Sequence, residues 1–190
     1  MGQYTHMIDL LAEQKRFILA HLGAGDTAVD FTMGNGNDTL FLSETVGESG
    51  HVYAFDIQAS ALESTAAHLK AAGAPENYTL IHASHDRVRE FVTGPIKAGM
   101  FNLGYLPGSG HKERTTMRVT TMPAVEAALD LLDSDGILLV AVYPGHEEGR
   151  LEGEMLDAYF RTLDRRRICV TRIEIINSPT SPFFFVCEKK

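Results

Sequence analysis

Short apolar segments alternate with amphipathic helical segments along most of the chain. Apolar side chains three and four positions apart predict helices over 4–22, 38–46, 58–72, 85–93, 121–132 and 147–163. Between these helices lie apolar runs of strand length, at 27–31, 51–56, 78–82, 99–103 and 137–143. Two more apolar runs, 168–176 and 182–188, are separated only by a turn-forming Asn-Ser-Pro segment. The pattern therefore predicts seven strands.

This order predicts an α/β fold with a doubly wound, mostly parallel sheet. Strands separated by helices pair in parallel through right-handed crossovers. The last two strands share a short turn, so they are expected to pair antiparallel, with the last strand reversed. A nicotinamide-type Rossmann domain would keep its last strands parallel. Because no repeat or linker interrupts the pattern, we expect one domain over 1–190, with an N-terminal helical segment (1–24) before a Rossmann-like core (25–190).

Composition and charge narrow the class of protein. The 190 residues are 44% hydrophobic and 22% charged, which is ordinary for a globular protein and excludes a disordered chain. The net charge of −8 argues against binding nucleic acid by overall charge, so such a partner would need a local basic patch. No apolar run approaches the roughly 20 residues that cross a bilayer, and the first residues do not resemble a signal peptide. We therefore expect no membrane contact and a cytoplasmic location.

The two cysteines, Cys169 and Cys187, both fall in predicted strands near the end of the sequence. Neither belongs to a Cys-x-x-Cys motif or a Cys/His cluster, so no metal site is expected. Nothing in the sequence argues for export. We therefore expect two reduced thiols that are neighbours in the core.

A glycine-containing loop follows the first predicted strand and opens a helix. Its candidate ligand-binding residues are Asp30, Gly34, Asn35, Gly36, Asn37 and Asp38. The glycines allow a sharp bend and a close approach of the backbone to a ligand, and the free N–H groups of the helix favour a carboxylate or a phosphate. Asp56 ends the next strand, where a carboxylate can accept hydrogen bonds from ribose hydroxyls. The combination predicts a site for a nucleoside-containing cofactor.

The third glycine of the dinucleotide-binding fingerprint is missing, because Thr39 occupies its place. Asp38 and Thr39 would crowd a pyrophosphate and add negative charge. They suit the amino group or the sulfonium of S-adenosylmethionine better, although the spacing alone also permits NAD. After the third strand, Ser84 and His85 could hydrogen-bond the adenine or could simply cap the short helix.

The loop after the fourth strand carries the candidate chemistry. Asn102 offers a carbonyl acceptor and Tyr105 a flat ring with a hydroxyl, and we expect these two residues to be catalytic. Their order is similar to the Asn-Pro-Pro-Tyr loop of amino-group methyltransferases, in which acceptors orient the target nitrogen. The alternative is an ordinary turn with a buried tyrosine. The expected substrate contacts are Leu103, Gly104, Pro107, Lys112, Arg114 and His146.

Three of these contacts have competing interpretations. Lys112 and Arg114 belong to a net basic segment, 111–118, that could meet phosphates, as could the arginines of 161–167. The alternative is that these charged segments are simply exposed to solvent, as charged loops commonly are. His146 follows the fifth strand and could be a general base or a substrate contact, or it could cap the next helix.

The motifs GNGNDTLFL, AFDIQ, HASH, NLGYLPG and YPGHEEG resemble, in this order, the "putative rRNA methylase" family of class I methyltransferases. The resemblance implies S-adenosylmethionine as cofactor and tRNA as partner, with methylation of the aminomethyl group of 5-aminomethyl-2-thiouridine at the wobble position. It assigns Asn35, Asn37 and Asp38 to the methionine part of the cofactor. The remaining assignments are Asp56 and Gln58 to ribose and adenine, Ser84 and His85 to the third cofactor loop, and Asn102 and Tyr105 to the amine.

One departure from the family puts the role of the 107–118 loop in question, since His111 precedes Lys112 where the family usually has an acidic residue. The working hypothesis is an N-methyltransferase acting on tRNA. A small-molecule N-methyltransferase, a non-catalytic protein that binds the cofactor and a nicotinamide dehydrogenase stay open as alternatives. A homodimer and the identity of the proton acceptor also stay open.

Overall fold

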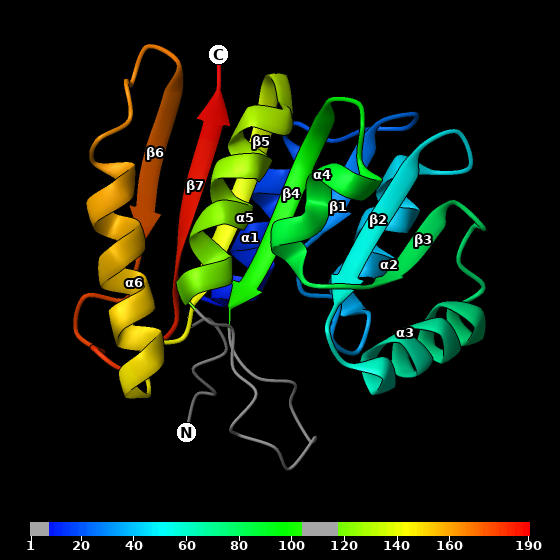
Figure 1. The fold of residues 1–190 in the computed structure, drawn as a ribbon, viewed down its shortest axis with the longest axis horizontal. Helices are drawn as coiled ribbons and strands as arrows, with labels where there is room; N and C mark the ends of the chain where they lie inside the picture. Colours follow the sequence, from blue (N-terminus) through cyan, green and yellow to red (C-terminus); the bar gives the residue numbers. More distant parts are fainter. Residues whose placement is uncertain (1–7, 104–117) are drawn as a thin grey trace, which may run out of the picture.

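The structure, a computed structural model, describes residues 8–103 and 118–190. Its centre is a seven-stranded sheet with the order β3-β2-β1-β4-β5-β7-β6 (Figure 1). The predicted residues Gly104, Tyr105, Pro107, Lys112 and Arg114 lie outside the described part, as do the first residues of the predicted N-terminal helix. The strands are β1 Thr27–Asp30, β2 His51–Asp56, β3 Tyr78–His82, β4 Ile96–Leu103, β5 Leu132–Val142, β6 Ile168–Ile173 and β7 Phe183–Lys189.

The topology confirms the predicted fold class. The first five strands pair in parallel, and β7 pairs antiparallel with both β5 and β6. β7 is thus the one reversed strand of this sheet, and residues 174–182 connect it to β6, which ends earlier than the predicted 176. Strand order reverses between β1 and β4, which makes the carboxyl ends of these two strands the position where doubly wound sheets bind ligands.

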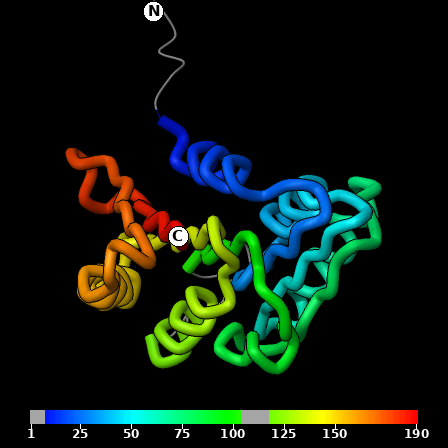
Figure 2. Tube along the Cα trace, turned by 90° about the horizontal axis from the view of Figure 1, so that it is seen from above, coloured from blue at the N-terminus to red at the C-terminus, as the bar shows by residue number. Residues whose placement is uncertain are grey.

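Helices cover both faces of the sheet (Figure 2). One face carries α1, α2 and α3, and its core packs around buried residues such as Ile18, Leu42 and Ala61. The other face carries α4, α5 and α6, with a larger core that includes Phe31, Phe101 and Leu156. The helices are α1 Leu10–Leu19, α2 Asn37–Val46, α3 Ala59–Ala72, α4 Val88–Phe91 after the 3-10 turn η1 His85–Arg87, α5 Arg118–Leu131 and α6 Glu147–Phe160.

Two strand boundaries differ from the prediction for the same reason. β4 begins at Ile96 rather than at 99, and β5 begins at Leu132 rather than at 137. The first residues of the two strands pair with each other across a register shift, and the polar residues 133–135 point to solvent there. A sequence pattern based on apolar residues misses such a polar, exposed start of a strand. Within it, Asp135 has a φ of 57°, which is unusual for a non-glycine residue.

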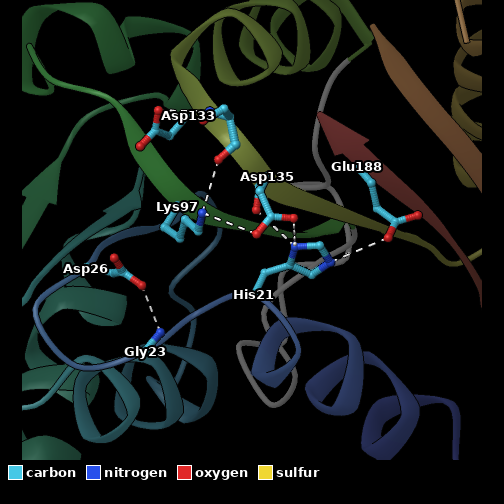
Figure 3. Close-up of polar contacts among 8 residues, drawn as sticks. His21, Gly23, Asp26, Lys97, Asp133, Asp135 and Glu188 are labelled. Carbon is cyan, nitrogen blue, oxygen red and sulfur yellow. Dashed lines mark hydrogen bonds and ion pairs between the residues drawn. The ribbon is translucent and has the colours of Figure 1, made fainter. Parts of the chain in front are cut away.

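Contacts at the amino edge of the sheet fix the end of α1 (Figure 3). The Nδ1–H of His21 donates to the carbonyl oxygen of Asp135 at 2.9 Å, and its Nε2 lies 3.4 Å from a carboxylate oxygen of Glu188 on β7. Lys97 Nζ donates to the carbonyl oxygen of Ser134 at 3.1 Å. The two contacts of His21, which we call the His21 clasp, join the end of α1 to β5 and β7, whereas the Lys97 contact joins β4 to β5.

A second long-range contact closes the last turn of α5. The amine of Lys189, on β7, donates to the carbonyl oxygens of Leu129, Asp130 and Leu132 at 3.2, 3.1 and 2.5 Å. The carbonyl groups of Leu129 and Asp130 end the helix and lack partners within it, that of Leu132 begins β5, and a cation there also complements the helix dipole. Lys189 therefore caps the helix that follows the candidate substrate loop.

Both cysteines are free, as expected, and they lie in the adjacent strands β6 and β7. Burial raises the pKa of the Cys187 thiol, which keeps it protonated and unreactive. In the part of the chain that the structure describes, no three His, Cys, Asp or Glu side chains form a group that could hold a metal ion. No helix among the described residues combines the length and apolarity needed to cross a membrane.

Candidate functional site at the carboxyl edge of the sheet

The glycine loop lies between β1 and α2, at the point where the strand order reverses. Gly34 and Gly36 have φ values of 51° and 82°, which only glycine adopts readily. A Cβ at Gly36 would lie 2.9 Å from Thr65 Cγ2 and 3.1 Å from its Cα, so the loop and α3 meet too closely for any side chain. The two glycines are therefore required by the backbone, as the sequence predicts.

Three side chains of α3 hold this loop from behind. Thr65 Oγ1 donates to the carbonyl oxygen of Gly34 at 3.1 Å, and His68 Nδ1–H donates to that of Asn35 at 2.9 Å. Ser64 donates to the side-chain oxygen of Asn35 at 3.2 Å. Sequence reasoning did not select these residues. Their signal is a set of polar residues on the loop-facing side of an otherwise Ala-rich helix.

Asp56 lies directly against the loop. One carboxylate oxygen accepts the N–H of Gly34 at 3.1 Å and the other accepts the N–H of Gln58 at 2.9 Å. Each oxygen keeps a free lone pair for a further donor. Gln58 precedes α3 and is buried, whereas Asn37 is exposed at the first position of α2.

Asp30 is a fully internal carboxylate. It accepts the N–H of Thr32 at 3.0 Å and the hydroxyl of Thr39 at 2.6 Å. Burial, with a smaller contribution from the charge of Asp38, raises the pKa of Asp30 to about 7. Thr39 is completely buried, so the expectation that it faces a ligand is wrong. Both side chains instead form the scaffold under the loop.

Asp38 and Asn102 meet across the point where the strand order reverses. The side-chain amide of Asn102 donates to Asp38 Oδ2, and its carbonyl oxygen accepts from the hydroxyl of Tyr143 at 3.3 Å. The backbone N–H of Asn102 donates to Thr32 Oγ1 at 2.8 Å. Two hydrogen bonds thus hold the side-chain amide, and a third fixes the backbone of the same residue. Tyr143 and Thr32 were not among the predicted site residues, although Tyr143 is the last residue of a predicted strand that ends at this edge.

Opposing effects act on the pKa of Asp38. Burial raises the pKa of its carboxyl group, while the positive charge of Lys15 on α1 and the hydrogen bond from Asn102 lower it. Lys15 also lies over the ring of Phe41, 5.0 Å from its centre. The N-terminal helix therefore contributes a cation to the site.

His85 is buried in an aromatic cluster and does not cap the short helix through its side chain. Its Nδ1–H donates to the carbonyl oxygen of Phe31 at 3.2 Å, and its ring meets Phe101 edge to face at 5.6 Å. Its Nε2 is buried without a hydrogen-bond partner, and burial lowers the pKa of the imidazole. A neutral His85 with this tautomer presents an acceptor at Nε2. Ser84 occupies the cap position of η1 without a side-chain hydrogen bond.

Of the remaining residues predicted to contact the substrate, some lie at the site and others do not. His146 caps α6, its Nδ1 accepting the N–H of Gly149 at 3.1 Å, which supports the capping interpretation. The Leu103 side chain is buried, so only its backbone could meet a substrate. The arginines of 161–167 follow α6 at the amino edge, the opposite edge from the site, and Arg161 and Arg166 pair with Asp157 and Asp164. This second basic cluster is therefore not part of the site.

Comparisons with known proteins agree with this geometry. The family model described as "Putative rRNA methylase" matches residues 52–189. A curated relative from Arabidopsis thaliana, named "tRNA (mnm(5)s(2)U34)-methyltransferase, chloroplastic", is 39% identical over 87% of this chain. The chain spans 64% of that relative's length.

Solved structures give the same result. A protein from Clostridium thermocellum, described as a "putative rRNA-methylase", is 36% identical, with a TM-score of 0.93 over 97% of this chain and all of that one. A "putative methyltransferase" from Streptococcus mutans, solved in complex with SAH, is 33% identical, with a TM-score of 0.87 over the same shares. The similarity therefore includes both the fold and the elements that carry the site.

Proposed function

The chain belongs to the "Putative rRNA methylase" family, and from this premise we propose that it is an S-adenosylmethionine-dependent N-methyltransferase. The proposed substrate is the aminomethyl group of 5-aminomethyl-2-thiouridine at the tRNA wobble position, and the proposed location is the cytoplasm. The name of the Arabidopsis relative supports the substrate. The observation that carries the proposal is the meeting of the glycine loop, Asp56 and the Asn102 amide at one point of the sheet edge.

The site residues fit the methyl donor. Gly34, Asn35, Gly36 and Asn37 form the loop at this edge of the sheet, and Asp56 beside it has lone pairs for the ribose hydroxyls. The buried acceptor at His85 Nε2 suits the exocyclic amine of adenine, and the family resemblance assigns Gln58 and Ser84 to the cofactor as well. The donor supplies an activated methyl group on sulfur. The protein's part is then to orient the amine, with Asn102 described here and Tyr105 assigned by the family resemblance.

A methyl-transfer assay tests the proposal. The purified protein and labelled S-adenosylmethionine are incubated with tRNA from a strain that lacks the activity, and the nucleosides are separated by mass spectrometry. We expect label in the methylaminomethyl nucleoside and in no other. Calorimetry with S-adenosylmethionine and NAD is expected to show binding of the first only, because the buried Thr39 leaves no third glycine for a pyrophosphate.

The net charge of −8 favours a second candidate, an N-methyltransferase of small amines. An RNA enzyme of this charge must use a local group of cations, for which Lys112 and Arg114 remain predicted. Its affinity for tRNA should then fall steeply between about 50 and 200 mM salt. Absence of RNA binding at low salt, together with transfer to a free amine, would establish the second candidate.

A homodimer remains a prediction that gel filtration with light scattering can check.

A further inference from the structure

Asp38 has one carboxylate oxygen without a hydrogen bond from the residues that the structure describes. Its Oδ2 accepts the Asn102 amide, whereas no described residue donates a hydrogen bond to Oδ1. Asp38 is partly buried in the first turn of α2, and Asn102 lies at the end of β4. The free oxygen is therefore next to the amide to which the family resemblance assigns the substrate amine.

The hydrogen bonds around Asn102 restrict what its amide can offer. The NH₂ group faces Asp38, and the carbonyl oxygen already accepts from Tyr143. A turned amide would place its carbonyl oxygen against the Asp38 carboxylate, which only accepts hydrogen bonds, so Asp38 fixes the orientation of the amide. The carboxylate of Asp38 is consequently the strongest hydrogen-bond acceptor at this position, and it carries the charge that a cation would seek.

The proposed substrate brings a proton that must be removed. A primary alkyl amine is an ammonium ion at neutral pH, comparable to a lysine side chain, and it has no lone pair until it loses one proton. A group that binds the ammonium ion and accepts this proton is therefore needed beside the target nitrogen.

We propose that Asp38 binds the protonated amine of the substrate and accepts its proton. This inference rests on the proposed function and replaces the assignment of Asp38 to the methionine part of the donor. The proton passes from nitrogen to Asp38, and the freed lone pair forms the N–CH₃ bond while the S–CH₃ bond breaks. Asp38 then releases its proton to water, so one proton is released for each methyl group transferred.

The charged groups around Asp38 are consistent with this role. Asp30 lies behind it, Lys15 faces it from α1 and Tyr143 faces it through Asn102 from β5. Burial raises the pKa of Asp38 above the ordinary value, which makes the carboxylate a better base, while the charge of Lys15 and the hydrogen bond from Asn102 act in the opposite direction.

A binding cycle tests the inference without depending on turnover. Two anticodon stem-loops, one with 5-aminomethyl-2-thiouridine and one with 2-thiouridine, are titrated at pH 7 in the presence of S-adenosylhomocysteine. The wild type should bind the amine-bearing RNA about tenfold more tightly, as one charged hydrogen bond allows. In Asp38→Asn this preference should fall below about twofold, while the affinity for S-adenosylhomocysteine stays within about threefold of the wild type. Glu44→Gln removes an exposed carboxylate from the same helix and should match the wild type.

Kinetics provide a second readout. At pH 7 we expect kcat of Asp38→Asn to fall by about 100-fold, with recovery towards pH 9.5 as solvent deprotonates the amine. Asp38→Ser should behave alike, so a folding defect of one variant does not decide the test. An unchanged preference for the amine, or a large loss of S-adenosylhomocysteine affinity in the variants, overturns the role of Asp38. An inactive wild type overturns the proposed function itself, and the inference falls with it.

Discussion

At the scale of single residues, Asp30 links the site to the stability of the fold. Its folded pKa of about 7 lies above 3.8, the ordinary pKa of an aspartate, so between these values the folded state binds more protons than the unfolded state. Stability therefore falls as pH rises from about 4 to about 7, and the unfavourable effect of the buried charge is complete above pH 7. This effect is the reverse of that of a carboxylate held in a salt bridge.

Asp30→Asn should remove this pH dependence. Asparagine can still accept from Thr32, and it carries no charge. We expect the free energy of unfolding of the variant, relative to the wild type, to rise between pH 4 and 7 by up to about 1.4 kcal/mol per pH unit and then to level off. Urea unfolding at several pH values measures it. A difference that is constant with pH would show that Asp30 is not the titrating group.

Tyr143→Phe tests the contact that holds the Asn102 amide. The hydrogen bond is long, at 3.3 Å, and one such bond contributes about 0.5–1.5 kcal/mol. We expect kcat for tRNA methylation to fall about three- to tenfold, with little change in the affinity for the methyl donor. Thermal unfolding of the variant should stay close to the wild type. A loss of donor affinity equal to the loss of kcat would place Tyr143 in the donor site instead.

At the scale of elements, the start of α6 packs so closely on the end of β5 that no side chain fits between them. A Cβ added at Gly149 would lie 2.1 Å from the carbonyl oxygen of Tyr143. Gly149→Ala should therefore push α6 away from β5 and destabilise the protein by about 2 kcal/mol or more, with loss of methyl transfer as Tyr143 moves. Gly145→Ala is the matched control, because its Cβ would meet only the carbonyl oxygen of Thr180 at 3.9 Å. Equal unfolding midpoints for the two variants would contradict this account.

The elements were largely predictable from the sequence, because the alternation of apolar runs and helices leads directly to the sheet and its reversed last strand. The glycine loop and Asp56 were predictable for the same reason, since local sequence determines them. The contacts among Asp38, Asn102 and Tyr143 were not, because they join three elements that are far apart in the chain. The hydrogen bonds from α3 to the glycine loop were missed for a similar reason. The sequence does not show which group a polar side chain contacts.

At the scale of the whole molecule, the His21 clasp fixes the helix that brings Lys15 to the site. His21→Leu would remove the donor to the Asp135 carbonyl oxygen and the contact with Glu188. We expect a loss of stability of about 1–2 kcal/mol. Hydrogen exchange should quicken in α1 more than in α3, which covers the same face and serves as an internal control. Equal acceleration in both helices would mean that the clasp acts on the whole fold rather than on α1.

The cap that Lys189 places on α5 has a consequence for the last strand of the sheet. Lys189 holds the last turn of a helix whose first turn follows the loop after β4. Acetylation of this one amine would remove the donor to three carbonyl oxygens and weaken the end of α5. A single modification on β7 would thereby act on the helix that follows the candidate substrate loop.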